Sequence, residues 1–156
     1  MRGRGLLVLV LGLVLGVLAV QLPDWLRPAD EGIAPPTITL PAADPACDPS
    51  QTLCSAGDEK RRLALRLKGP VTGLRPFRVE LVAAGMKVRE VQLEFTMPDM
   101  DMGQNRYRLL PEGNGWVGLV TLPICATGRS DWWVTVRVLG DEQQWEAGFP
   151  FEMQGR

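Results

Sequence analysis

The sequence predicts an all-β domain that follows an apolar N-terminal segment. Two observations lead to this fold class. Apolar and polar residues alternate in seven separate runs, and residues typical of turns stand between most of them. After the N-terminal segment, no stretch carries a long apolar stripe with the 3.6-residue period of a helix. Because each run has one apolar and one polar face, we expect half-buried antiparallel strands.

The alternating runs are short and evenly spaced along the chain. They cover residues 63–67, 78–83, 91–97, 106–109, 116–124, 132–138 and 144–151, with turn residues at 69–70, 85, 111–115, 128 and 140–141. The clearest hairpin joins Arg108 to Trp116 through Pro-Glu-Gly-Asn-Gly. Trp132 and Trp133 point to opposite faces of one strand, so we expect one indole in the core and one at the surface. Seven such strands are typical of an immunoglobulin-like antiparallel β-sandwich.

The N-terminus carries an export signal. Arg2 and Arg4 precede residues 5–20, sixteen positions without a charged or polar side chain. A membrane-spanning helix needs about 20 apolar residues, whereas the apolar part of a signal peptide has about 7–15. The length of the run and Trp25 favour an uncleaved anchor over residues 1–22, and cleavage after residues 17–19 is the alternative. We therefore expect a single-pass inner-membrane protein with its C-terminal domain in the periplasm, or a secreted domain after cleavage.

A proline-rich stretch follows the anchor. Six prolines fall between residues 23 and 45, and proline has no backbone N–H to donate to a helix or a sheet. We expect residues 23–58 to form a linker and cysteine-containing leader, a semi-rigid tether. The β-sandwich domain is then expected to cover residues 59–156.

Composition excludes several classes of function. The chain has 17 basic and 18 acidic residues and no histidine. Without histidine there is no Ser-His-Asp or Cys-His catalytic site, no HExxH zinc site and no haem held by imidazole. A net charge of −1 offers no basic surface for a nucleic acid. We expect a binding or structural module rather than an enzyme.

Three cysteines, Cys47, Cys54 and Cys125, occur in this exported chain. Thiols outside the cytoplasm tend to pair, so one disulfide is expected, with three pairings open. A bond between Cys47 and Cys54 would close a small loop, whereas a bond between Cys54 and Cys125 would tie the leader to the sandwich. The remaining thiol is either a buried, inert side chain or a soft metal ligand.

The sharpest local feature is a methionine cluster, Met97-Pro-Asp-Met100-Asp-Met102-Gly. Pro98 cannot donate to a central ladder, so the cluster should leave the sheet at an edge or a loop, with Met100 and Met102 on one face. Thioethers and thiolates are soft ligands that select Cu(I). Met97, Met100, Met102 and Cys125 are therefore candidate Cu(I) ligands. Two other interpretations remain, namely core packing and a surface for a partner.

These residues also resemble a known family. The run from Met97 to Leu109, followed by Gly115-Trp116-Val-Gly and Leu122-Pro-Ile-Cys125, is similar to the YtkA-like/FixH-like exported domains. It is more similar still to uncharacterised membrane-anchored proteins of proteobacteria that share C-x6-C, M-x-M-G-x-N-R and a cysteine before a short turn and tryptophan. The resemblance spans about residues 47–138. It implies copper handling and respiratory oxidase assembly beside thiol-containing copper chaperones.

Within this resemblance, Met100, Met102 and Cys125 match the motif, and Met97 lies at the end of the preceding strand. The absence of histidine departs from many copper-site relatives, which weakens a Cu(II) site and leaves a Cu(I) site. The expected function is a membrane-tethered Cu(I)-binding module that delivers or buffers copper for an oxidase. The expected partners are the inner membrane and a copper chaperone or oxidase subunit. The alternative is an assembly module without metal that contacts a membrane partner through its methionine loop.

Overall fold

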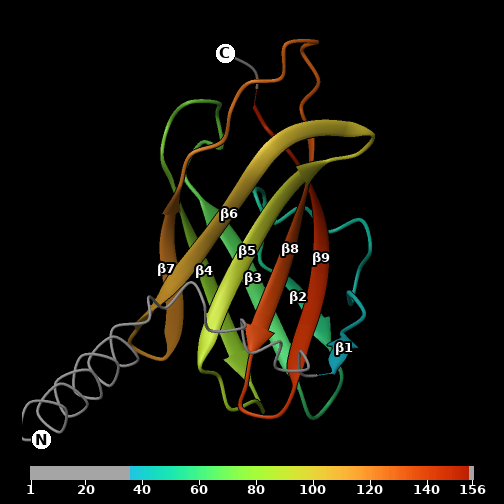
Figure 1. The fold of residues 1–156 in the computed structure, drawn as a ribbon, viewed down its shortest axis with the longest axis vertical. Coiled ribbons are helices and arrows are strands. Elements are labelled where there is room, and N and C mark those ends of the chain that lie inside the picture. The colour runs from blue at the N-terminus through green and yellow to red at the C-terminus, as the bar shows by residue number, and fades with distance from the viewer. Residues whose placement is uncertain (1–35, 155–156) are drawn as a thin grey trace, which may run out of the picture. The chain divides into compact units, whose positions relative to one another are not determined.

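The structure, a computed structural model, describes residues 36–154 as an all-β domain (Figure 1). The all-β prediction is confirmed, and each of the seven alternating runs contributes a strand. The nine strands are β1 (Thr37–Thr39), β2 (Cys54–Gly57), β3 (Arg62–Lys68), β4 (Phe77–Ala84), β5 (Glu90–Met97), β6 (Met100–Glu112), β7 (Gly115–Val120), β8 (Asp131–Leu139) and β9 (Gln144–Glu152).

The strands form one curled, mixed sheet in the order β1-β9-β8-β5-β6-β7-β4-β3-β2 (Figure 1). The pair β1–β9 is parallel, and the other pairs are antiparallel. Strand β6 turns the corner between the two halves, because Leu109 pairs with β5 whereas Leu110 pairs with β7. Such strands, which change partner along their length, make the corners of packed sheets.

The chain after β1 runs between the two ends of the sheet. The N–H of Leu40 donates to the carbonyl of Glu146 on β9 at 2.7 Å. Two residues later, Ala42 forms a bridge with Ala56 of β2. This segment therefore contacts both ends of the sheet.

The sheet begins earlier in the chain than residue 59, the expected start of the domain. Strands β1 and β2 lie in the predicted leader, and Leu40 and Cys54 are buried. The prolines are compatible with this, because Pro36 and Pro41 flank the three-residue β1 rather than interrupt it. The predicted anchor over residues 1–22 and the linker before residue 36 lie outside the described residues. Among residues 36–154, no helix is long and apolar enough to cross a membrane.

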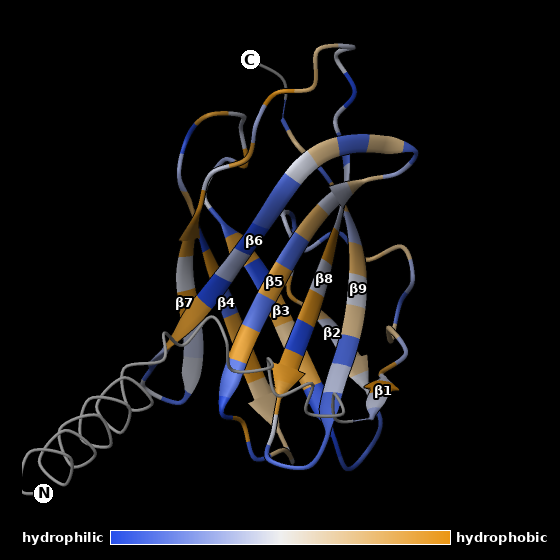
Figure 2. Ribbon diagram, viewed as in Figure 1, coloured by the Kyte–Doolittle hydropathy of each residue, from blue (hydrophilic) through white to orange (hydrophobic). Residues whose placement is uncertain are grey.

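The core lies between the inner faces of the curled sheet, where apolar residues alternate with outward polar ones (Figure 2). In the described part of the chain, every buried side chain is hydrophobic or a cysteine. At its centre Phe95 is fully buried and packs edge-to-face on three other rings, Phe77, Tyr107 and Phe151, with ring centroids 5.9–6.3 Å apart. These rings come from β4, β6 and β9, so Phe95 joins both halves of the sheet.

Two local predictions are also confirmed. Trp132 is buried at 2% exposure, whereas Trp133 is 39% exposed on the outer face. The hairpin between β6 and β7 closes with Glu112 opposite Gly115, and Gly113 in the left-handed region at φ 57° allows the two-residue turn.

Candidate functional site

The methionine hairpin, residues 97–102, joins β5 to β6. Met97 and Met100 face each other across a two-residue turn made of Pro98 and Asp99. Proline fixes the first turn position, and Asp99 takes a left-handed backbone with φ 57°, as position i+2 of a type II turn requires. Directly opposed residues share a face of the ladder with Cβ atoms about 4.5–5.5 Å apart. The turn therefore places two thioether side chains next to each other.

An irregular bulge follows the turn. Phe95 pairs with Asn105 and Met97 pairs with Met100, so Thr96 alone opposes residues 101–104. The carboxylate of Asp101 accepts the Gly103 N–H at 2.8 Å, and the Asn105 amide donates to the Met102 carbonyl at 3.0 Å. The bulge thus has its own hydrogen bonds. Met100 and Met102 are both partly buried and pack against the core.

Cys125 lies in the cysteine segment, residues 121–130, which connects β7 to β8. The methionine hairpin and the cysteine segment meet at the same end of the domain, at the top of Figure 1. The Cys125 thiol donates to the Met100 sulfur with an Sγ–Sδ distance of 3.1 Å, and its sulfur lies 3.0 Å from the Thr127 hydroxyl. Two of the four predicted ligands, 25 residues apart in the chain, are therefore in direct contact.

Two tethers fix the cysteine segment against β5 and β6. Arg129 donates from Nη1 to the Pro98 carbonyl at 3.0 Å, and its other nitrogens bind the Asp131 carboxylate. At the other end of the segment, the hydroxyl of Tyr107 on β6 donates to the Thr121 carbonyl. The contact between Cys125 and Met100 is consequently held from both sides.

The surroundings of Cys125 favour its thiolate. Hydrogen bonds from the side chain and backbone of Thr127 lower the pKa of the thiol, and the nearby Arg129 lowers it further. Burial acts in the opposite direction and is outweighed. Because the thiolate is the form that binds soft metals, this environment suits a ligand.

The four predicted ligands differ in exposure. Met97 and Cys125 are buried, at 3% and 2% exposure, whereas Met100 and Met102 are partly exposed. Met97 adjoins Met100 through the ladder but also serves as a core residue. Met102 packs against the core from the bulge, and the structure records no sulfur contact between it and Cys125. Of the two residues of the sulfur pair, Cys125 is buried and Met100 is partly exposed to solvent.

The disulfide joins Cys47 and Cys54, with an S–S distance of 2.00 Å and Cα atoms 5.7 Å apart. This is one of the three pairings that the sequence left open. It leaves Cys125 as a free, buried thiol.

A metal site of the more usual residue types does not occur here. Residues 36–154 contain no group of three or more histidine, cysteine, aspartate or glutamate side chains that could hold a metal ion. The sulfur pair consists of Cys125, which belongs to that set of residue types, and Met100, which does not. Any metal bound there would have to be one that accepts thioether ligands, and Cu(I) is such a metal.

Two residues that surround the Cys125 thiol, Thr127 and Arg129, were not predicted from the sequence. Thr127 and Arg129 follow Cys125 in the run Cys-Ala-Thr-Gly-Arg-Ser-Asp, where we predicted only a turn. The signal in the sequence is the placement of a hydroxyl and a guanidinium two and four residues after the odd cysteine.

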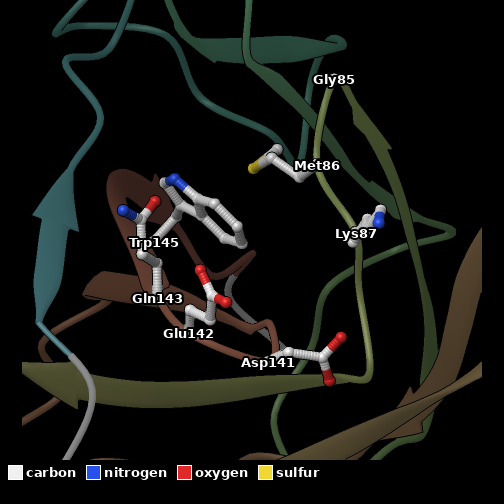
Figure 3. A pocket seen from close by; sticks show the side chains of 7 residues that line it. All are labelled: Gly85, Met86, Lys87, Asp141, Glu142, Gln143 and Trp145. Carbon is white, nitrogen blue, oxygen red and sulfur yellow. The ribbon is translucent and has the colours of Figure 1, made fainter.

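A separate hollow of about 310 Å³ lies at the other end of the domain from the methionine hairpin (Figure 3). It is lined by the connection between β4 and β5, the connection between β8 and β9, and Trp145. Met86 extends toward the Trp145 ring across it, and Lys87, Asp141 and Glu142 lie around its rim (Figure 3). Asp141 also pairs with Arg89 at 3.6 Å. The rim thus combines two carboxylates with one lysine, and one of the carboxylates, that of Asp141, is already paired.

Comparison with known proteins does not identify the chain. No family model matches it, and no curated protein matches it. Among solved structures, a crystal structure of an engineered protein from the Northeast Structural Genomics Consortium is similar at 14% identity and a TM-score of 0.45. The match covers 60% of this chain and 20% of the other, so this chain spans about a fifth of that protein's length.

Proposed function

We propose that this protein is a membrane-tethered, periplasmic Cu(I)-binding module that delivers or buffers copper for assembly of a respiratory oxidase. The observation that carries the proposal is the 3.1 Å contact between the Cys125 and Met100 sulfurs. A thiolate and a thioether from two separate segments form a soft ligand pair, which favours Cu(I) over hard ions. Met97, which opposes Met100 in the ladder, and Met102, two residues after Met100, are the candidates for a third sulfur ligand.

The arrangement suits transfer of an ion. One side of the pair is buried and the other partly exposed, so an incoming ligand from a partner can approach past Met100. A site with few soft ligands can exchange them one at a time, because no rigid shell has to be dismantled. The resemblance to YtkA-like/FixH-like domains supports copper chaperones and oxidase subunits as the partners.

The proposal is tested by titrating Cu(I) into the full chain in phosphatidylcholine nanodiscs against a competing chelator. Ascorbate is the reductant, so that the disulfide between Cys47 and Cys54 stays oxidised and offers no thiols. We expect binding of one equivalent in the native chain. The double variant Met100→Leu with Met102→Leu should lose at least about tenfold in affinity, because leucine keeps the apolar bulk and removes the sulfur.

Met86→Leu is the matched control, because Met86 is partly buried against the core at the other end of the domain. Its affinity should equal that of the native chain. If the native chain binds no Cu(I), or if the double variant binds as tightly as Met86→Leu, the copper proposal is wrong.

Arg129 provides a second prediction. Changing Arg129→Gln removes the link between the methionine hairpin and the cysteine segment. The Cu(I) affinity should therefore fall by about 10–100-fold, which is usual when a residue that holds a metal ligand in position is lost. The unfolding free energy should change by less than about 1 kcal/mol, because the pair of Arg129 with Asp131 is partly exposed. Chelator competition and urea unfolding measure the two effects. Arg61→Gln is the control, and equal affinities of the two variants would show that the link does not support the site.

A second candidate function is an assembly module without metal. Three large apolar side chains, Val82, Leu110 and Leu119, are exposed on the adjacent strands β4, β6 and β7. A protein contact through this face would be mixed in character, because the charged Arg78 lies opposite Leu119 on it. Retained binding of a membrane partner by the methionine double variant would favour this function.

The type of β-fold and the attachment to the membrane are also inferred. We infer that the curled sheet is a variant of the immunoglobulin-like β-sandwich, supported by its two facing halves and antiparallel hairpins. Anchoring through residues 1–22 is supported by the uncharged run after two arginines.

A further inference from the structure

A second hollow, of about 650 Å³, lies beside the cysteine segment but does not include the sulfur pair. Its walls come from the connection between β3 and β4, from the cysteine segment and from the residues at the end of β9. Its volume lies within the range of about 300–1,000 Å³ that is usual for small-molecule sites. We call it the arginine hollow, after Arg75 on its wall.

The walls of the arginine hollow are fixed by backbone hydrogen bonds. The N–H of Leu74 donates to the Leu122 carbonyl at 2.9 Å, which holds the first wall to the cysteine segment. At the end of β9, the N–H of Met153 donates to Ser130 and the N–H of Gln154 donates to Val71, both at 2.8 Å. The cavity is therefore preformed rather than a gap between loose loops.

Its lining combines apolar surface with a few polar groups. Pro70, Ile124 and Met153 supply apolar walls. Gly73 lets Ile124 lie close, because a Cβ at position 73 would come within 2.4 Å of the Ile124 side chain. Apolar walls with a small number of polar groups are the usual make-up of a ligand pocket.

The polar groups of the lining favour an anion. Arg75 has no ion-pair partner among the described residues, whereas Arg129, also in the lining, is bound to Asp131. The lining contains no carboxylate, so it carries a net positive charge. A guanidinium without an ion-pair partner among the described residues matches a carboxylate, because it can donate to both carboxylate oxygens.

We propose that the arginine hollow binds a small organic carboxylate with a short apolar body. Its carboxylate lies against Arg75, and its apolar part lies against Ile124 and Met153. This site is distinct from the proposed copper site, because neither Cys125 nor a methionine of the hairpin lines it, although Arg129 borders both.

The test uses the full chain in phosphatidylcholine nanodiscs with hexanoate as the probe. Phenylglyoxal modifies exposed arginines, and peptide mass spectrometry reports each arginine separately. We expect hexanoate to slow the modification of Arg75 at least fivefold and to leave Arg66 unchanged. Arg66 is the internal control because it is exposed on β3 and has no ion-pair partner in the described structure. Hexylammonium, with the same chain and the opposite charge, should protect neither residue, and acetate should protect Arg75 much less than hexanoate does.

Two variants keep the test falsifiable. Thr72→Val keeps the shape of the wall and removes a hydroxyl whose oxygen is buried from solvent, so the chain should fold and hexanoate should protect Arg75 as it does in the native chain. Arg75→Gln should weaken hexanoate binding at least tenfold, measured by saturation-transfer NMR with empty nanodiscs subtracted. Equal protection of Arg75 and Arg66, equal binding of hexanoate and hexylammonium, or native binding by Arg75→Gln would overturn the proposal. Complete protection of Arg75 before any probe is added would also overturn it, because the hollow would then be filled by the protein itself.

Discussion

Changing Cys125→Ser should lower the Cu(I) affinity of the full chain by more than about 100-fold, or about 2.7 kcal/mol. Cys125 supplies the thiolate of the proposed site, and a serine hydroxyl is a hard, protonated group that Cu(I) does not select. Loss of a residue that only holds a ligand in position lowers metal affinity by about 10–100-fold, so loss of a direct ligand should lower it more. Chelator competition in nanodiscs, under ascorbate, gives the two affinities.

The pH dependence provides an independent check on the same residue. Cu(I) displaces the thiol proton, so the affinity of the native chain should fall as the pH decreases below the pKa of Cys125. The hydrogen bonds from Thr127 lower this pKa. The loss of affinity should therefore begin at a lower pH than for an ordinary cysteine, and the Cys125→Ser variant should not show this dependence.

The structural control for Cys125→Ser is its stability. Serine is nearly isosteric with cysteine and Thr127 can still hydrogen-bond to it, so the domain should stay folded. If the variant is folded and binds Cu(I) like the native chain, Cys125 is not a ligand. The interpretation of Cys125 as an inert buried thiol would then stand.

Alternation in the sequence predicts strands β3 to β9 because each of them has one face in the core and one in solvent. Strands β1 and β2 have three and four residues, too few for a period of two to be visible. Strand β2 pairs locally with the next strand, β3, whereas the pairing of β1 is set by a tertiary contact, with β9 more than a hundred residues later. Such a distant pairing leaves no local signal.

In the candidate site, too, some features follow from the local sequence and others are set by tertiary contacts. Softness of the side chains identifies Met97, Met100, Met102 and Cys125 from the sequence alone. That Cys125 contacts Met100 depends on how the cysteine segment crosses the end of the sheet. The link from Arg129 to the Pro98 carbonyl depends on that crossing as well, whereas the contact of Thr127 with Cys125 is local and follows from their spacing.

The largest effect on stability is expected from Phe95→Ala. Phe95 is fully buried and contacts Phe77, Tyr107 and Phe151, which belong to β4, β6 and β9. Removing a buried phenylalanine ring costs about 3–5 kcal/mol, since the apolar contacts are lost and a cavity remains. A domain has a total stability of about 5–15 kcal/mol, so a large share is lost. Urea unfolding of residues 35–156, followed by circular dichroism, measures the change.

Two variants separate the ring cluster from general effects of mutation. Phe95→Leu keeps most of the apolar volume and should cost clearly less than Phe95→Ala. Leu110→Ala changes an exposed side chain on β6 and should stay within about 0.5 kcal/mol of the native domain. The same cluster lies two residues from Met97, so Phe95→Ala should also loosen the methionine hairpin and weaken Cu(I) binding. A loss below about 1 kcal/mol for Phe95→Ala would mean that these rings do not join the two halves of the sheet, and the support that the core gives to the hairpin would have to come from elsewhere.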